Sequence, residues 1–429
     1  MSLTTQPTLP FAGYMTLLSM LIDTTIRQNA RSDRTGTGTA SMFGDQLTFD
    51  LNTAFPLLPW RPVHLVDVLR ELAWFLEGSI DVNRLKALGS NIWNQWALPT
   101  DQKHDMPMSP YERARHYAET SGKSLDSVIQ ELQALGDMEN GHKHLDTLNV
   151  PRTLEHTVVQ AGSIGPMYGA QWRKWRSVTI APQGNIHRED FDQVKKLIHD
   201  LTHNPYSRRH IISAWNVAYL PSETMTPHDN VRAGKMAIAP CHQMVQFYVV
   251  DLSFEQRLEV FHANRVALED EGIRLIDAAY LDKQGVPLKG LSAKVHMRSC
   301  DIMLGAPYNI ASYATLVHLL CAKLGMAPQK LIMSFGDLHL YSNHLDAAIE
   351  MHNRYTGHME NPDYAYSLSP KFYAPEGFDV TSFMGKTNEF GEILVEQADV
   401  VKDKLAMLAG GLTDYNPYPK LKAAMPIAV

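Results

Sequence analysis

The stretch that most restricts the fold is Pro240-Cys241-His242, because the proline fixes the backbone just before a run with the composition of a strand. That run, residues 246–250, is rich in the aromatic and β-branched side chains that are typical of strands. A second apolar run ends farther along the chain in Arg298-Ser299-Cys300-Asp301. We expect the two runs to pair, which would place Arg298 beside the Cys241 thiol.

Three stretches have apolar residues at helical spacing. They are residues 65–76, with Gly78 placed to end the helix; 191–201, stopped by Asn204-Pro205; and 310–324, with Asn309 at its start and Gly325 beyond its end. Helices alternating with strand-like runs predict an α/β fold with a mixed sheet covered by helices.

Two polar stretches interrupt this pattern. Residues 98–162 are rich in Lys, His and Asp and contain a helical pattern at 128–135, so we expect an inserted subdomain there. Residues 252–290 separate two core strands and are expected to form an exposed extension. The whole chain, residues 1–429, is expected to form one catalytic domain that carries these two insertions.

The composition restricts the partners. The formal net charge of −7 gives no general attraction to nucleic acid or to an anionic membrane, and no apolar run is long enough to span a bilayer. Three cysteines without a paired spacing favour a reducing compartment, and neither a disulfide framework nor a zinc site is expected. We expect a soluble, cytoplasmic protein, without a metal, a membrane or direct nucleic-acid binding.

A lone cysteine in apolar surroundings is more often a small core residue than a nucleophile. A nearby cation makes the reactive thiolate more available, and Arg298 is placed to supply it. Glu71 has two readings as well. It leans against an apolar helical stripe, so it is either a boundary carboxylate or a group whose pKa is raised enough to move protons at neutral pH.

The remaining candidates also have plain structural alternatives. Asn309 is either a helix N-cap or an amide that reads the N3–H donor and O4 acceptor of uracil. His339 and Tyr341 alternate along an expected strand and therefore share a face, where they can meet a sugar hydroxyl. Trp93 is either core or a platform for a flat cofactor. Arg208 and Arg209 are either surface charges or a phosphate clamp.

With these residues in place, the chain resembles the thymidylate synthase family. The resemblance rests on motifs in the family's order at residues 33–39, 71–78, 92–93, 165–169, 207–209, 240–242, 298–301, 309–313, 336–341 and 426–429.

The resemblance implies a twofold dimer, with the sheet at the interface, that transfers a one-carbon unit from 5,10-methylenetetrahydrofolate to C5 of dUMP. The implied roles cover proton transfer, the phosphate, the sugar, the base and the folate. They are Cys241 as nucleophile; Glu71 and Tyr168 in proton transfer; Arg34, Arg298 and Ser299 on the phosphate, with Arg208 and Arg209 from the partner subunit; His339 and Tyr341 on the sugar; Asn309 on uracil; and Asp301, Trp93, Glu71 and Val429 at the folate.

Several positions depart from the methylating members of that family. Met297 stands where glutamine is usual, Asn94 and Gln95 follow Trp93, and residues 59–62 replace a Thr-Thr-Lys-Arg motif. We therefore expect a dUMP hydroxymethylase of the phage type, in which water captures the one-carbon unit for DNA modification. The alternatives are a thymidylate synthase, favoured by Trp93 and the family-like C-terminus, and a silent binding paralogue, which is disfavoured because the implied catalytic residues are present.

Overall fold

The computed structural model describes residues 11–27, 31, 36–100, 102–108, 110–135, 143–159, 161–180, 186–263, 276–359, 370–375, 378–387 and 393–427. Arg34 and Val429, both predicted as site residues, lie outside these ranges. The helices of the described part include none that is long and apolar enough to cross a membrane.

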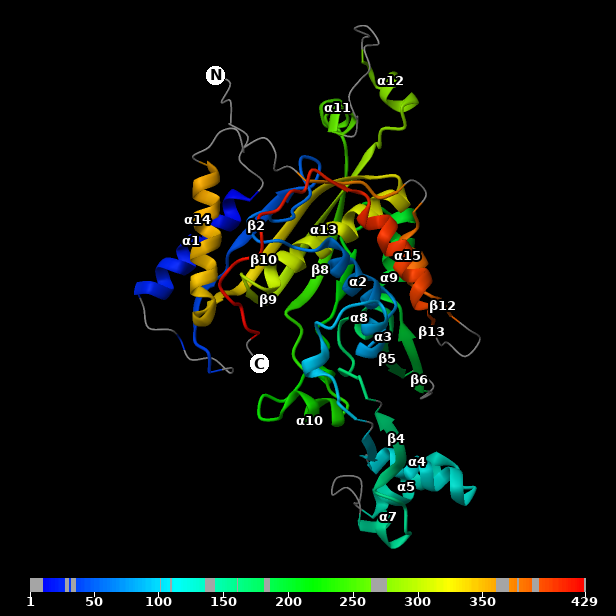
Figure 1. The fold of residues 1–429 in the computed structure, drawn as a ribbon. Helices are drawn as coiled ribbons and strands as arrows, with labels where there is room; N and C mark the ends of the chain where they lie inside the picture. The colour runs from blue at the N-terminus through cyan, green and yellow to red at the C-terminus, as the bar shows by residue number, and fades with distance from the viewer. Residues whose placement is uncertain are drawn as a thin grey trace.

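A mixed sheet forms the centre of the molecule (Figure 1). Its strands run in the order β1-β10-β9-β8-β7, and β2 also pairs with β10. The β9–β10 pair is parallel and the other pairs are antiparallel. The bounds are β1 Thr39–Phe43, β2 Gln46–Asp50, β7 Ile211–Ser213, β8 His242–Asp251, β9 Lys289–Asp301 and β10 Ala327–Tyr341. The predicted mixed α/β fold is confirmed, and so is the pairing of the two runs that carry Cys241 and Arg298.

Helix α13 (Gly305–Leu324) connects the parallel strands β9 and β10 and packs on both of them. Helix α2 (Leu65–Leu76) packs against α13, and α15 (Ala398–Ala409) packs against α2 (Figure 1). Helices α1 (Ala12–Arg27) and α14 (Leu345–Met359) lie side by side at one edge. The burial of α13 on most of its sides explains its nearly continuous apolar sequence.

Two of the three predicted helices differ from expectation at their starts. Helix α2 has the predicted range, and Gly78 follows it with a positive φ of 74°. Helix α13 begins at Gly305, so the prediction that Asn309 starts the helix is wrong, and Asn309 lies in its second turn. Helix α9 begins at Gln193, because Phe191 belongs to the preceding strand.

The described part of residues 98–162 contains the antiparallel strand pair β3–β4 and the helices α4, α5 and α7, which project from one end of the molecule (Figure 1). Their apolar side chains form a separate small cluster around Val128, Leu132 and Leu145. The fully buried Arg113 stabilises it, because its guanidinium donates to Asp146 Oδ1 over 2.7 Å and also to backbone carbonyls. The elements are β3 Gln102–Pro107, α4 Pro110–Ser121, α5 Leu125–Ala134, α7 Lys143–Thr147 and β4 Thr153–Val159.

Residues 252–290 carry α11 (Phe254–Ala263) and α12 (Ala278–Lys283), which project from the opposite end (Figure 1). A third apolar cluster holds them together around Val260, Phe261 and Leu281. The two small clusters are distinct from the main core, but the boundaries at 98–162 and 252–290 stay predictions.

The other elements are short. They are α3 Val82–Ala87, η1 Asn94–Trp96, α8 Tyr168–Arg173, β5 Trp175–Ile180, β6 Ile186–Phe191, α9 Gln193–His203, η2 Val217–Tyr219, α10 Pro227–Arg232, η3 Ser342–His344, β11 Lys371–Phe372, η5 Val380–Phe383, β12 Lys386–Thr387, β13 Ile393–Leu394 and β14 Leu412–Thr413.

Candidate active site

Cys241 lies directly before β8, at the point where β8, β9 and α8 meet. Its backbone N–H donates to the Tyr168 hydroxyl over 2.8 Å, and its carbonyl accepts from the Arg298 backbone N–H over 2.9 Å. Cys241 is half-buried, whereas Cys300 and Cys321 are buried, and burial raises the pKa of both of their thiols. Cys241 is therefore the cysteine best placed to react with a substrate.

Two backbone carbonyls of the residues just before Cys241 hold the Arg298 guanidinium. Its Nε donates to the Pro240 carbonyl over 2.9 Å, and its Nη2 donates to the Ala239 carbonyl over 2.8 Å. The guanidinium also lies over the Trp215 ring, 5.9 Å from the centroid. A cation fixed in this position favours a thiolate and offers a fork for a phosphate.

Tyr168 belongs to a cluster of aromatic rings next to Cys241. Its ring stacks on His242 with 4.0 Å between centroids, and His242 Nδ1 lies 2.7 Å from the Tyr313 hydroxyl. Burial lowers the pKa of His242 to about 3, so the imidazole is neutral at physiological pH. Burial, followed by the nearby Cys241, raises the pKa of Tyr168, so its hydroxyl stays protonated.

Glu71 reaches the same region from α2. The Trp93 indole Nε1–H donates to its Oε1 over 2.8 Å. Burial raises the pKa of Glu71 from 4.5 to about 7, although the Trp93 hydrogen bond opposes the shift. A carboxyl with this pKa can both give and take a proton near neutral pH. The structure thus supports the second reading of Glu71.

Glu71→Gln is expected to stabilise the protein at about pH 8 but not at about pH 4. The folded protein keeps a proton on Glu71 between its ordinary pKa of 4.5 and about 7, where the unfolded chain has lost it. The free energy of unfolding therefore falls as pH rises through this window, and the glutamine variant avoids up to about 3 kcal/mol of that loss. Urea unfolding at the two pH values measures the difference. Glu223→Gln, at an exposed position, is the control, and an equal gain at both pH values would contradict the account.

Asp301 connects the end of β9 with α13 and the C-terminal region. Its Oδ1 accepts from the backbone N–H groups of Met303 and Leu304 over 2.8 and 3.1 Å. Its Oδ2 lies 3.7 Å from Nδ1 of the buried His344, whose Nε2 is 2.8 Å from the Pro426 carbonyl. This chain of contacts holds residue 426 near Asp301.

Asn309 projects from the second turn of α13 and is half-buried. None of the residues that the structure describes forms a hydrogen bond with its amide. The N-cap alternative is excluded, because Leu304 precedes the first residue of α13 and Asn309 lies inside the helix. The amide donor and acceptor of Asn309 are therefore available to a ligand.

His339 and Tyr341 lie on the same face of β10, as predicted from their spacing, with 4.9 Å between their ring centroids. His339 Nδ1 lies 2.8 Å from Asp337 Oδ1, which fixes the orientation of the imidazole. In register, His339 is opposite Asp301 and Asp337 is opposite Ser299. The described part of the chain contains no cluster of three or more His, Cys, Asp or Glu side chains able to hold a metal.

Arg208 and Arg209 are exposed and lie away from Cys241 of the same chain. The Gln246 side chain donates to the Arg208 carbonyl over 3.2 Å, and Gln246 pairs with Ile211. Gln246 is five residues beyond Cys241, or about 16 Å of strand. An arginine side chain does not bridge that distance.

Sequence reasoning missed Arg61 as a site residue. Arg61 is 5% exposed, and its Nε and Nη1 have no hydrogen-bond partner among the described residues. Its guanidinium lies over the Tyr308 ring, 5.4 Å from the centroid, one residue before Asn309. A buried cation without a carboxylate partner is costly, and it is suited to an anionic ligand.

Arg61→Met is expected to raise the free energy of unfolding of the ligand-free protein by about 2 kcal/mol. The substitution removes an unpaired buried charge and leaves a side chain that still packs on Tyr308. The same variant is expected to bind folate more weakly. Thermal unfolding with and without folate measures both effects, with Arg176→Met at an exposed position as control. A variant that is less stable than the wild type and binds folate unchanged would exclude a role of Arg61 in holding an anionic ligand.

The comparisons with known proteins agree with the fold. Residues 12–383 match the family model described as thymidylate synthase. The chain is 32% identical over 323 residues to a thymidylate synthase of Staphylococcus haemolyticus (strain JCSC1435). The matched region covers 74% of this chain and 79% of the relative. The chain therefore belongs to the thymidylate synthase family. Members of this family transfer a one-carbon unit to dUMP and use methylenetetrahydrofolate as co-substrate.

Proposed function

We propose that Cys241 is the nucleophile of a one-carbon transfer from 5,10-methylenetetrahydrofolate to C5 of dUMP. The observation that carries the proposal is that the half-buried Cys241 donates its backbone N–H to the Tyr168 hydroxyl, while the Arg298 guanidinium is bonded to the carbonyl of the preceding residue, Pro240. The thiolate adds to C6 of the uracil ring, and C5 becomes nucleophilic and attacks the folate methylene carbon. This step needs a thiolate, a bound phosphate and a proton donor near O4.

Glu71 and Tyr168 are proposed to handle the protons. Glu71, with its pKa near 7, protonates O4 as electrons move into the ring. Tyr168 accepts a hydrogen bond from the Cys241 amide, which fixes its hydroxyl beside the reacting ring and the C5 proton. His242, which is neutral and stacked on Tyr168, keeps that ring in place.

The ligands are proposed to fit the remaining groups as follows. The unpaired Asn309 amide accepts from uracil N3–H and donates to O4, while His339 and Tyr341 bind the sugar hydroxyl. Arg34, Arg298 and Ser299 bind the phosphate. Trp93, Asp301, Glu71 and Val429 contact the folate, and the buried Arg61 meets its anionic part.

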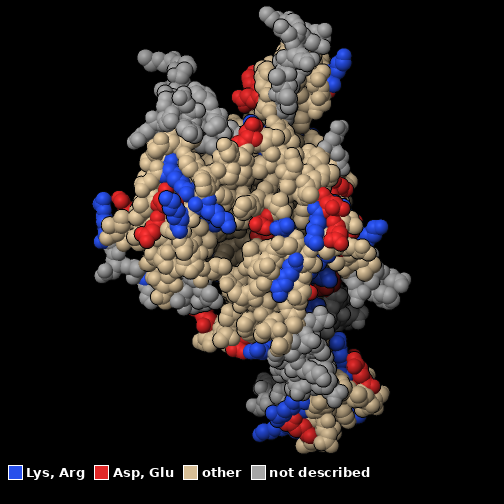
Figure 2. Space-filling view, viewed as in Figure 1, with Lys and Arg blue, Asp and Glu red and all other residues tan. Residues whose placement is uncertain are grey.

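The exposed Arg208 and Arg209 are proposed to complete the phosphate site of a second subunit. Their distance along β8 from Cys241 of the same chain supports this arrangement. It implies a homodimer with the sheets at the interface. Figure 2 shows positive and negative side chains interspersed on the visible face, without a broad basic surface among the residues drawn in colour there.

We propose 5-hydroxymethyl-dUMP as the product. The folate nitrogen leaves with the C5 proton, which the Tyr168 hydroxyl helps to transfer, and the nucleotide then carries an electrophilic exocyclic methylene. Water adds to this carbon, Glu71 takes its proton, and the Cys241 thiolate then leaves C6. The pKa of Glu71 near 7 suits it as the base that takes this proton. Asn94 and Gln95 line a separate cavity, whose lining does not include Cys241, Glu71 or Tyr168.

A thymidylate synthase reaction is the second candidate, because two observations favour exclusion of water. Trp93 is 8% exposed, and residue 426 is held by the buried His344. The Staphylococcus haemolyticus relative also carries the name thymidylate synthase. In that reaction, tetrahydrofolate delivers hydride to the methylene, so dTMP and dihydrofolate form.

Mass spectrometry of the nucleotide formed from dUMP and methylenetetrahydrofolate separates the two products. The proposal predicts a hydroxymethyl gain without the absorbance of dihydrofolate. A methyl gain with equimolar dihydrofolate would assign the second candidate. Loss of tritium from C5-labelled dUMP is expected in both cases, and its absence would indicate a silent relative.

A further inference from the structure

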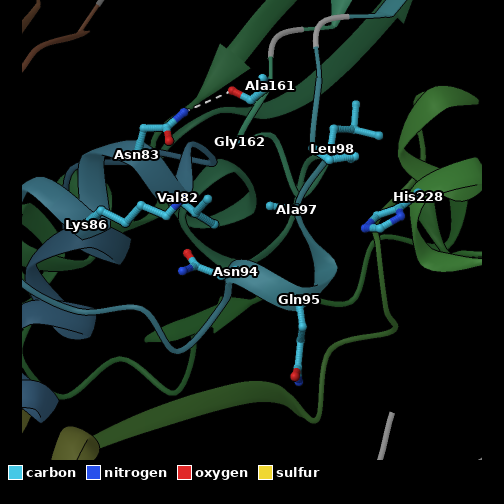
Figure 3. Close-up of a pocket in the computed structure, with 11 residues that line it drawn as sticks. Val82, Asn83, Lys86, Asn94, Gln95, Ala97, Leu98, Ala161, Gly162 and His228 are labelled. Carbon is cyan, nitrogen blue, oxygen red and sulfur yellow. Dashed lines mark hydrogen bonds between the residues drawn. The ribbon is translucent and has the colours of Figure 1, made fainter.

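A cavity of about 300 Å³ lies where the first insertion joins the body of the protein (Figure 3). Its wall comes from α3, the η1 turn after Trp93, α10 and both connections of residues 98–162. Cys241, Glu71, Tyr168 and Asn309 are not among its lining residues. The cavity is thus separate from the proposed catalytic site.

The polar groups in this cavity are nitrogen donors and amides. Lys86 extends across one side, and His228 faces the cavity from α10 on the other side (Figure 3). His228 Nε2 is buried without a hydrogen-bond partner among the described residues. No Asp or Glu lines the cavity, so none of the lining residues neutralises the Lys86 ammonium. A lysine and an unsatisfied imidazole nitrogen that face one space suit an anion.

The rest of the lining is suited to an apolar group. Val82 and Leu98 are almost fully buried and form part of the wall together with Ala97. The Asn83 amide is already used, because it donates to the Ala161 carbonyl over 3.1 Å. Gln95 extends away from the other labelled side chains in Figure 3, so we assign it no contact. A volume of 300 Å³ equals about ten waters, enough for a ring that carries one anionic group.

We propose that this cavity binds a small organic anion, with its apolar ring against Val82 and Leu98 and its phosphate or carboxylate between Lys86 and His228. The ligand would contact the neck of the insertion, where the Gly162 N–H donates to the Leu98 carbonyl over 2.8 Å. It would also contact Asn94, the residue after Trp93. The Trp93 indole donates a hydrogen bond to the Glu71 carboxylate. An occupant of the cavity would therefore contact the turn that follows Trp93, next to the proposed catalytic carboxyl.

Isothermal titration calorimetry of the full chain with phenyl phosphate tests this proposal. Saturating dUMP fills the nucleotide site, and a parallel titration without dUMP keeps the result independent of the proposed function. Inorganic phosphate and phenol measure the anionic and apolar parts separately, and benzoate compares a carboxylate with a phosphate. Tryptophan fluorescence is the second readout, because Trp93 and Trp96 flank Asn94 and Gln95.

We expect one phenyl phosphate per chain, about tenfold tighter than inorganic phosphate or phenol, with a change in tryptophan fluorescence. Lys86→Gln and His228→Gln are each expected to weaken binding about tenfold while turnover of dUMP persists, which shows that the variants fold. Lys195→Gln on the solvent face of α9 removes the same charge and is expected to bind like the wild type. No binding up to about 10 mM, or equal binding by all three variants, would overturn the proposal.

Discussion

Cys241→Ala is expected to lower turnover of dUMP by about 10⁴-fold or more, because no other group of the site can form the bond to C6. Nucleotide binding is expected to persist, since Arg298 is held by the backbone carbonyls of Ala239 and Pro240 and not by the thiol. Steady-state kinetics and equilibrium binding of dUMP measure the two effects.

Cys300→Ala is the matched control for this variant. Cys300 is 3% exposed, and burial raises the pKa of its thiol, so it has no access to substrate. Its replacement is expected to cost about 1 kcal/mol of stability and to leave turnover within a few-fold of the wild type. Turnover that is retained by Cys241→Ala but lost in Cys300→Ala would show that Cys300, and not Cys241, is the nucleophile.

Asn309→Asp is expected to change the ratio of kcat/KM for dUMP over dCMP by at least about 100-fold in favour of dCMP. The amide of Asn309 has no hydrogen-bond partner among the described residues, and it matches the donor and acceptor of uracil. A carboxylate offers acceptors alone, which suit the exocyclic amino group of cytosine. Competition kinetics with both nucleotides gives the ratio directly.

Asn353→Asp, on the exposed face of α14, is the control, because it introduces the same charge far from α13. It is expected to leave the ratio unchanged. If Asn309→Asp also leaves the ratio unchanged, the base is recognised by other groups.

The periodicity of the sequence predicted α2 and α9 because each has a strong one-sided apolar pattern, whereas α13 was predicted from its long apolar run. The α2 range and its end at Gly78 follow from local rules, as does the left-handed Gly325 after α13. The start of α13 did not follow, because the chain already turns at residues 302–304, where the Asp301 carboxylate accepts from the backbone N–H groups of Met303 and Leu304. Local propensity had placed the N-cap at Asn309.

The site residues were predicted in part from the spacing of chemical groups and in part from the family resemblance. Pairing of the Cys241 and Arg298 runs could be expected from their composition, whereas the contact between Glu71 and Trp93 joins residues that sequence spacing does not relate. Arg61 lies in the stretch 59–62 that departs from the family motif, but its burial without a hydrogen-bond partner for Nε and Nη1 among the described residues is a property of the folded chain.

His242 and His344 were missed for a similar reason. A histidine next to a cysteine gives no sign that it will stack on Tyr168, and His344 acquires its role only when residue 426 folds back to it. A signal was present for His242, since its position at the start of β8 turns it toward the core. The roles of both depend on contacts across long sequence separations.

A covalent complex with 5-fluoro-dUMP tests the central claim most directly, because fluorine at C5 blocks the step that would release the enzyme. Incubation with this nucleotide and methylenetetrahydrofolate is expected to add one nucleotide and one folate to each chain, in a complex that survives denaturation. Peptide mass spectrometry is expected to place the adduct on Cys241. Absence of an adduct, or an adduct on Cys300 or Cys321, would contradict the account.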